Sequence, residues 1–165
     1  MTSTAISNAE PTSRWRRALA LAVCLFASAC SLPVADKESD GLARTFYDEM
    51  RSGADLSRDP HLSPAVRAAA AATTPDQLRA QIPAGPWTKI NVTGWNFNSS
   101  SETGASATLG HDYVYPKATV HVMTGLHKEP GQTAWTIVGF RAIADGSPQP
   151  ALVLGAMPQV DSSSN

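Results

Sequence analysis

The residue with the most distinctive chemistry in this chain is Cys30, one of only two cysteines. Cys30 directly follows three small residues, Ala27-Ser28-Ala29, at the end of an apolar run that also contains Cys24. If that run is removed as a leader, the mature chain keeps a single thiol at its first position and cannot form an internal disulfide. Because an unpaired thiol is a liability in an oxidising compartment, the sequence predicts that Cys30 is chemically modified.

The start of the chain has the organisation of a secretory signal peptide. A basic cluster of Arg14, Arg16 and Arg17 precedes an apolar run over Ala18–Ala29. A membrane-spanning helix needs roughly 20 apolar residues, whereas this run is shorter and ends in small residues, as a cleaved signal does. The basic cluster stays on the cytoplasmic side of the membrane, so we expect the remainder of the chain to be exported.

The segment Ala27-Ser28-Ala29-Cys30 resembles the lipobox of bacterial lipoproteins, in which small residues precede an invariant cysteine. The resemblance implies cleavage between Ala29 and Cys30, a diacylglycerol thioether on the Cys30 sulfur, and acyl chains such as palmitate on the new amino group. Ala27 replaces the usual leucine, so ordinary signal-peptidase cleavage at an A-x-A site stays an alternative. Ser31 stands where an aspartate would signal inner-membrane retention, so the resemblance implies the outer membrane, facing the periplasm.

The expected organisation of the chain follows from this leader. Residues 1–29 are the signal peptide, 30–37 a lipidated tether, 38–156 a single folded domain and 157–165 a disordered tail. The length of 165 residues suits one ordinary domain. Each buried CH₂ contributes about 0.8 kcal/mol to membrane binding, so two or three acyl chains on Cys30 would attach the protein permanently.

The composition excludes several classes of protein. Apolar residues make up 42% of the chain, charged residues 16%, and the formal net charge is −1. No basic excess is present to neutralise phosphates, which argues against nucleic acid as a partner. The balance also excludes collagenous, coiled-coil and multi-span membrane proteins. We therefore expect no cofactor other than the covalent acyl chains.

Four histidines are the remaining candidates for metal or acid–base chemistry: His61, His111, His121 and His127. No HExxH or CxxC spacing is present, so the sequence predicts no metal site. His111 and His121 lie on neighbouring predicted strands and could pair across them, although surface or packing histidines are the default interpretation. We expect His127 to lie exposed at a turn, beside the charged Lys128.

Aromatic side chains in the second half of the chain could fill a core, which is their commoner role, or line a cavity. A candidate pocket combines Trp95, Tyr113, Tyr115, His121 and Trp135. Catalysis would require convergent acid–base groups with shifted pKa values, for which Asp112 is a further candidate. Because Asp112 alternates away from Tyr113 on its strand, we assign no catalytic residue.

Helices are predicted in the first half of the domain. Apolar residues recur every four positions over 39–52, which predicts one helix. Ser63 followed by Pro64 begins a second, to about residue 72. The capping box Thr74-Pro75-Asp76-Gln77 begins a third, to about residue 82.

Period-two alternation from Trp87 onward predicts strands. These strands are expected over 87–98, 105–115, 117–126 and 133–143, and residues 151–154 are a candidate for a further edge strand. Gly94 interrupts the first strand and Trp95 continues in the opposite phase, which predicts a bulge or a bend. The strand over 133–143 is apolar on both faces, which predicts a central position or cover on both sides.

Three helices followed by a four-stranded antiparallel meander indicate an α+β protein. This order of elements, with the late aromatic strand Trp135–Arg141, resembles the NTF2-like or cystatin-like roll, in which N-terminal helices pack on a curved sheet. The resemblance covers residues 38–144. It also implies an alternative activity, because NTF2-like enzymes of the SnoaL and ketosteroid-isomerase type act on small apolar substrates in a conical pocket.

The expected function is that of a membrane-anchored bacterial envelope lipoprotein. Its small, non-enzymatic domain would bind an envelope protein or a small ligand near the membrane. A periplasmic NTF2-like enzyme and an assembly subunit of an envelope complex stay open as alternatives. An open, deep pocket with convergent Asp or His side chains would favour the enzyme, whereas a filled inner space and an exposed apolar patch would favour a protein partner.

Overall fold

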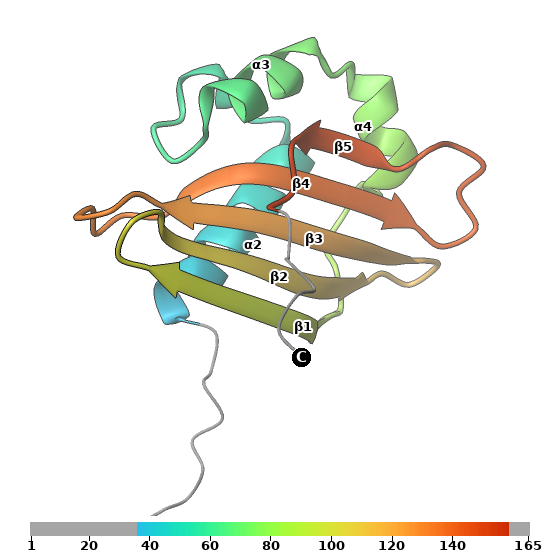
Figure 1. The fold of residues 1–165 in the computed structure, drawn as a ribbon. Coiled ribbons are helices and arrows are strands. Elements are labelled where there is room, and N and C mark those ends of the chain that lie inside the picture. Colours follow the sequence, from blue (N-terminus) through green and yellow to red (C-terminus); the bar gives the residue numbers. More distant parts are fainter. Residues whose placement is uncertain (1–35, 159–165) are drawn as a thin grey trace, which may run out of the picture. The chain divides into compact units, whose positions relative to one another are not determined.

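The computed structural model describes residues 36–158, which form the α+β arrangement expected from the sequence (Figure 1). The helices are α2 (Lys37–Ser52), the short 3-10 helix η1 (Leu56–Arg58), α3 (Pro64–Ala72) and α4 (Pro75–Gln81). The strands are β1 (Lys89–Ser100), β2 (Gly104–Val114), β3 (Thr119–Lys128), β4 (Thr136–Ala144) and β5 (Leu152–Gly155). The predicted signal peptide and Cys30 lie outside the described residues.

The strands form one antiparallel sheet in the order β1-β2-β3-β4-β5. The expectation of four strands was therefore wrong by one, because β5 pairs with β4 and completes the sheet. Leu152 and Leu154 of β5 are buried, while Val153 between them points outward. An alternation over so few residues does not distinguish a strand from a loop in the sequence. In the structure, pairing with β4 supplies the hydrogen bonds that hold these residues as a strand.

Helix α2 lies across one face of the sheet, here called the inner face (Figure 1). The Asp36 side chain accepts a hydrogen bond from the Glu38 amide at its start, and Gly53, with φ of 76°, ends it in the left-handed conformation. Its buried side is Ser39, Ala43, Phe46, Tyr47 and Met50. Phe46 meets Phe140 of β4 edge-to-face at 5.2 Å between ring centroids, so α2 reaches from β2 to β4.

Helices α3 and α4 lie at the β4–β5 side of the sheet, the end opposite β1 (Figure 1). Both begin as the sequence predicts, with Ser63 capping α3 and the Thr74–Gln77 capping box starting α4. Val66 of α3 is fully buried. A side chain added at Gly155 of β5 would collide with it, so α3 packs closely against this edge of the sheet.

The predicted irregularity at Gly94 is present. The pairing of β1 with β2 shifts register between Val92 and Gly94, as expected for a bulge. The shift keeps Val92, opposite His111, and Trp95, opposite Leu109, on the inner face. Strand β4 lies between β3 and β5, so it is an interior strand beside the edge of the sheet and not the central one. The prediction was a central position or cover on both faces.

The chain after β5 crosses the other face of the sheet, here called the outer face. The Ala156 amide donates to the Val138 carbonyl at 3.2 Å. Added side chains at Gly139 and Gly125 would collide with Ala156 and Pro158, respectively. Because these two glycines leave room for the crossing segment, Pro158 packs against the sheet, although the sequence analysis assigned it to a disordered tail.

Candidate functional site

The space between α2 and the sheet is filled by aromatic rings. Tyr47 of α2 stacks on Tyr113 of β2 with ring centroids 3.7 Å apart. The hydroxyl groups of Tyr47 and Tyr115 lie 2.8 Å apart and form a buried hydrogen bond. Burial raises the pKa of all three phenols above their usual value. These tyrosines therefore stay neutral and act as core side chains.

A polar group lies beside this aromatic core. His111 of β2 is only 1% exposed, and its Nε2 lies 2.8 Å from Oδ1 of Asp40 on α2. Arg44 forms an ion pair with the other oxygen of Asp40 at 2.9 Å. Burying an imidazole requires a partner of this kind, so the contact joins α2 to β2.

The pairing of His111 with His121 that the sequence left open does not occur, and both follow the default interpretation of packing and surface histidines. In the register of β2 with β3, His111 lies opposite Val122 and His121 lies opposite Asp112. The two histidines are thus one step out of register, and a shift of one residue places side chains on opposite faces. His111 is inside the core and His121 is on the outer face, so they cannot share a metal ion or a proton.

His121 instead forms a three-residue cluster that the sequence analysis did not identify. Its Nδ1 lies 2.7 Å from Asp112 Oδ1, and its Nε2 lies 2.9 Å from Asp145 Oδ1. Hydrogen bonds with Asp112 and Asp145 raise the pKa of His121 above its usual value. The His121 side chain is 46% exposed, and Asp145 lies in the turn after β4, where its amide donates to the Thr119 carbonyl. The cluster therefore ties this turn to β3 at the surface.

The other two histidines differ from each other: His61 is exposed and is held through its backbone, whereas the His127 ring has side-chain partners. The His61 amide donates to Asp59 Oδ1 at 2.8 Å in the loop before α3. His127 Nδ1 lies 3.1 Å from the Ser106 hydroxyl, and its Nε2 lies 3.4 Å from Glu129. His127 is half-buried rather than exposed as expected, because the neighbouring strand β2 lies alongside its ring.

The five residues of the candidate pocket do not line one cavity. Tyr113, Tyr115 and Trp135 are buried, Trp95 is exposed at the edge of the sheet, and His121 is on the outer face. Phe97 nevertheless links the two tryptophans. It follows Trp95 by two residues on the same face of β1, and its ring contacts the ring of Trp135. The structure therefore divides the predicted pocket into a filled core and an edge surface.

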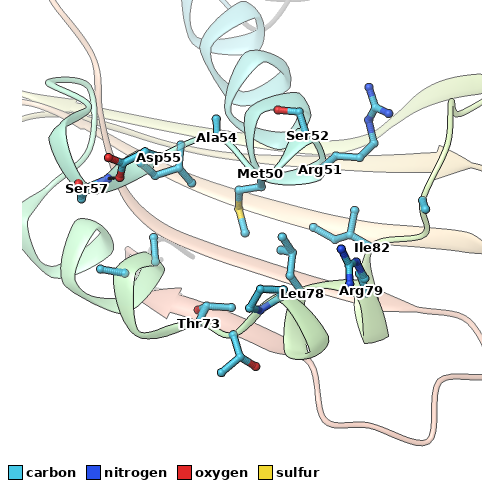
Figure 2. Close-up of a pocket in the computed structure, with 17 residues that line it drawn as sticks. Met50, Arg51, Ser52, Ala54, Asp55, Ser57, Thr73, Leu78, Arg79 and Ile82 are labelled. Carbon is cyan, nitrogen blue, oxygen red and sulfur yellow. Dashed lines mark hydrogen bonds between the residues drawn. The ribbon is translucent and has the colours of Figure 1, made fainter.

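A groove of about 280 Å³ lies at the end of α2, between it and helices α3 and α4 (Figure 2). Met50 extends from α2 toward Leu78 of α4, and Ile82 closes one side. Arg51 turns away from the groove and donates to the Gly85 carbonyl at 3.1 Å. Ligand pockets are usually roughly 300–1,000 Å³, so this groove, whose lining mixes apolar and polar side chains, has room only for a small molecule.

The most unusual surface is on the inner face of β1. Val92, Trp95 and Phe97, here called the β1 patch, are 52%, 43% and 51% exposed. Trp95 and Phe97 lie directly opposite the buried residues Leu109 and Ala107 of β2. The patch therefore continues the apolar inner face of the sheet beyond the part that is buried.

The β1 patch lies on an edge strand whose outer hydrogen-bonding side pairs with no other strand in the described part of the chain. From Ile90 to Ser101 the sequence contains no charged residue. Long, uncharged, apolar edge strands are a hazard that proteins normally blunt with lysine, proline or a bulge. Only the bulge at Gly94 does so here, and the stretch after it is open to a partner.

The patch is close to the start of α2. Phe97 meets Trp135 edge-to-face with ring centroids 6.2 Å apart. The Trp135 Nε1–H donates to Asp36 Oδ2 at 3.0 Å, and the Lys128 ammonium lies 4.6 Å from the centre of the same ring. Asp36 is the first described residue, so the β1 patch lies beside the point where the N-terminal segment joins the domain.

Residues 36–158 contain no group of three or more His, Cys, Asp or Glu side chains arranged to hold a metal ion. Within the same range, none of the helices has the length and hydropathy needed to cross a bilayer.

Comparison of the chain with protein-family models, with curated proteins and with solved structures finds no match.

Proposed function

We propose that this protein is a lipid-anchored bacterial envelope lipoprotein whose α+β domain binds a protein partner along the β1 patch. The lipobox-like segment ending in Cys30 supports the anchor. Cys30 and Asp36 are six positions apart, a distance of about 20 Å at full extension. The domain would therefore lie close to the membrane, and so would the β1 patch, which is linked to Asp36 through Trp135.

The observation that carries the binding role is the exposure of Val92, Trp95 and Phe97 on an uncharged edge strand. A strand from a partner can add to such an edge through main-chain hydrogen bonds, and its alternate side chains then pack on one face. Trp is also among the residues most enriched at the energetic centres of protein interfaces. Burial of the patch would remove the apolar surface that the folded domain leaves in water.

We also infer that the helices and antiparallel meander form a roll of the NTF2-like or cystatin-like type, on the basis of their order along the chain. An enzyme of the NTF2-like type would need an open pocket on the inner face. The stacked rings of Tyr47 and Tyr113 occupy that position. A protein-binding module is the function that the geometry supports best.

The anchor is tested by substituting each cysteine in turn. Cys30→Ser should abolish incorporation of labelled fatty acid and release the protein from the membrane fraction. Cys24→Ser is the matched control, because this cysteine would be discarded with the leader, and it should leave labelling unchanged. Labelling and membrane recovery of the Cys30→Ser variant at the level of the unsubstituted protein would contradict the anchor.

The binding role is tested by placing a photoreactive phenylalanine analogue at position 97 in living cells. We expect a cross-linked product that is lost when Trp95→Ser is added, since Trp95 supplies the neighbouring apolar contact. The matched control carries the same analogue at Met123, an exposed apolar residue on the outer face. Equal cross-linking from positions 97 and 123, or none from 97, would contradict a binding role for the β1 patch.

A further inference from the structure

We propose that the partner of the β1 patch is a second copy of this chain, with two β1 strands paired antiparallel about a two-fold axis at Asn96. This inference deepens the proposed function and rests on its claim that the β1 patch binds protein. The resulting dimer would contain one continuous sheet formed by both copies. Four features of the described residues lead to this partner.

The first feature is the self-complementarity of the strand. With the axis at Asn96, Trp95 of each copy lies opposite Phe97 of the other, which forms two aromatic cross-strand pairs. Asn96 points to the outer face, since it pairs with Thr108 between the buried residues Ala107 and Leu109. The two Asn96 amides would meet on that face, where each can donate to and accept from the other.

The second feature is charge. When a strand pairs with its own copy about a two-fold axis, any charged residue near the axis lies close to the same charge in the other copy. The stretch from Ile90 to Ser101 contains no charged residue, so this repulsion is absent. The residues that flank this stretch, Lys89 and Glu102, have opposite signs. Antiparallel pairing brings Lys89 of one copy toward Glu102 of the other at both ends, which favours this pairing over a parallel one.

The third feature is the position of the N-terminal segment. Residues directly opposite in an antiparallel pair point to the same face, so pairing Trp95 with Phe97 keeps both α2 helices on one side of the joint sheet. Asp36 is linked to Phe97 through Trp135, so both chain starts lie near the axis. Two lipid tethers could then enter the same membrane, and confinement there would raise the effective concentration of each copy for the other.

The fourth feature is the opposite edge of the sheet. Strand β5 has only four residues, and α3 packs closely against it at Gly155. Short, covered edges do not template further pairing. A two-fold contact through β1 therefore closes on itself and yields a dimer, not a fibre.

The test is cysteine cross-linking of the full-length protein in its native membranes, with copper–phenanthroline as the oxidant. Lipidation of Cys30 leaves the mature chain without another thiol, so an introduced cysteine reports its own contacts. Asn96→Cys places two thiols directly opposite each other, at the separation that a disulfide requires. Asn98→Cys is the matched control, because it has the same side chain and face, and its two copies would lie about 14 Å apart.

We expect a disulfide-linked dimer that is about tenfold more abundant for Asn96→Cys than for Asn98→Cys, because only the first pair meets the geometric limits of a disulfide. Adding Trp95→Ser and Phe97→Ser to the Asn96→Cys chain should abolish the dimer. Equal cross-linking at both positions, or monomer from both, would overturn the two-fold pairing.

The outcomes separate this inference from the proposed function. If Asn96→Cys forms an adduct with a different protein and no dimer, the second copy is the wrong partner and the β1 patch is still a binding surface. If the unsubstituted chain itself cross-links, Cys30 is free, which contradicts the lipid anchor and leaves the pairing to be judged from the difference between positions 96 and 98. If position 96 yields no adduct at all and the photoreactive analogue at position 97 also yields none, both proposals are wrong.

Discussion

Strands β1 and β2 present the same apolar pattern on the inner face of the sheet, yet only one of them is buried. Leu109 of β2 lies directly opposite Trp95 of β1, and Ala107 lies opposite Phe97. The β2 residues are buried beneath α2, whereas the β1 residues are exposed. The two strands are neighbours in one sheet, so the difference arises from what covers each of them and not from their secondary structure.

An alternating pattern therefore identifies the apolar face of a strand, but it does not show which part of the protein, if any, packs on that face. On β2 the cover is part of the domain itself, since Tyr47 stacks on Tyr113. On β1 the core covers Ile90, at the start of the strand, in part, whereas the aromatic contact of the β1 patch is the edge-to-face one between Phe97 and Trp135. An apolar strand face without an internal cover is typical of an interaction surface, which is the basis of the proposed function.

The largest effect should come from removing one ring on each side of this boundary. Phe140→Ala deletes a fully buried ring that contacts Phe46, and such deletions lower the free energy of unfolding by about 3–5 kcal/mol. Phe97→Ala deletes a half-exposed ring and should cost about 1 kcal/mol or less in dilute protein. Urea unfolding of both variants measures the difference, and equal losses would show that β1 belongs to the core.

A smaller effect should distinguish two hydroxyl groups within the covered region. Tyr47→Phe removes the buried hydrogen bond with Tyr115 and should lower the free energy of unfolding by about 1–2 kcal/mol. Tyr113→Phe is the matched control, because its buried hydroxyl has no hydrogen-bond partner among residues 36–158. The Tyr113 variant should be as stable as the parent or more stable. The reverse order in thermal or urea unfolding would contradict the packing described for the inner face.

Local signals in the sequence predicted much of the fold. The capping residues Ser63 and Thr74 place the starts of α3 and α4 correctly. The change of phase after Gly94 predicts the bulge in β1. These features succeed because each depends on the hydrogen bonding or side-chain alternation of a few consecutive residues.

Features that depend on register between strands were not predictable in the same way. The sequence left open whether His111 and His121 are neighbours, and a difference of one residue in the pairing of β2 with β3 separates them to opposite faces. Asp145 joins His121 only because the turn after β4 brings it back beside β3. The exposure of Trp95 likewise depends on how far α2 extends across the sheet, which no local pattern encodes.

The smallest effect concerns the outer face, where the His121 cluster should tune stability with pH. Hydrogen bonds with Asp112 and Asp145 raise the pKa of His121, so the protonated ring stabilises the folded state. That contribution is fully present below the unfolded pKa of about 6.5 and is lost as the pH rises through the higher folded value. For an exposed group of this kind it should amount to about 0.5 kcal/mol.

His121→Gln should therefore lower the free energy of unfolding at pH 5.5 and have little effect at pH 9. Asn98→Gln, on the same face of the sheet but outside the cluster, is the control for surface substitution. Denaturant unfolding at the two pH values gives the comparison. An unchanged pH dependence in the His121 variant would show that the cluster does not stabilise the fold.

Hydrogen–deuterium exchange of the protein in native membranes, where the proposed anchor would hold it, tests directly whether a partner covers β1. Peptides covering β1 report whether a partner covers its open edge, and peptides covering β4, which is paired on both sides, provide the internal reference. If β1 is paired in the membrane, the amides of Trp95–Ser100 should exchange as slowly as those of β4. Fast exchange of the outward-pointing β1 amides in native membranes, at the rate of an open edge strand, would contradict the account.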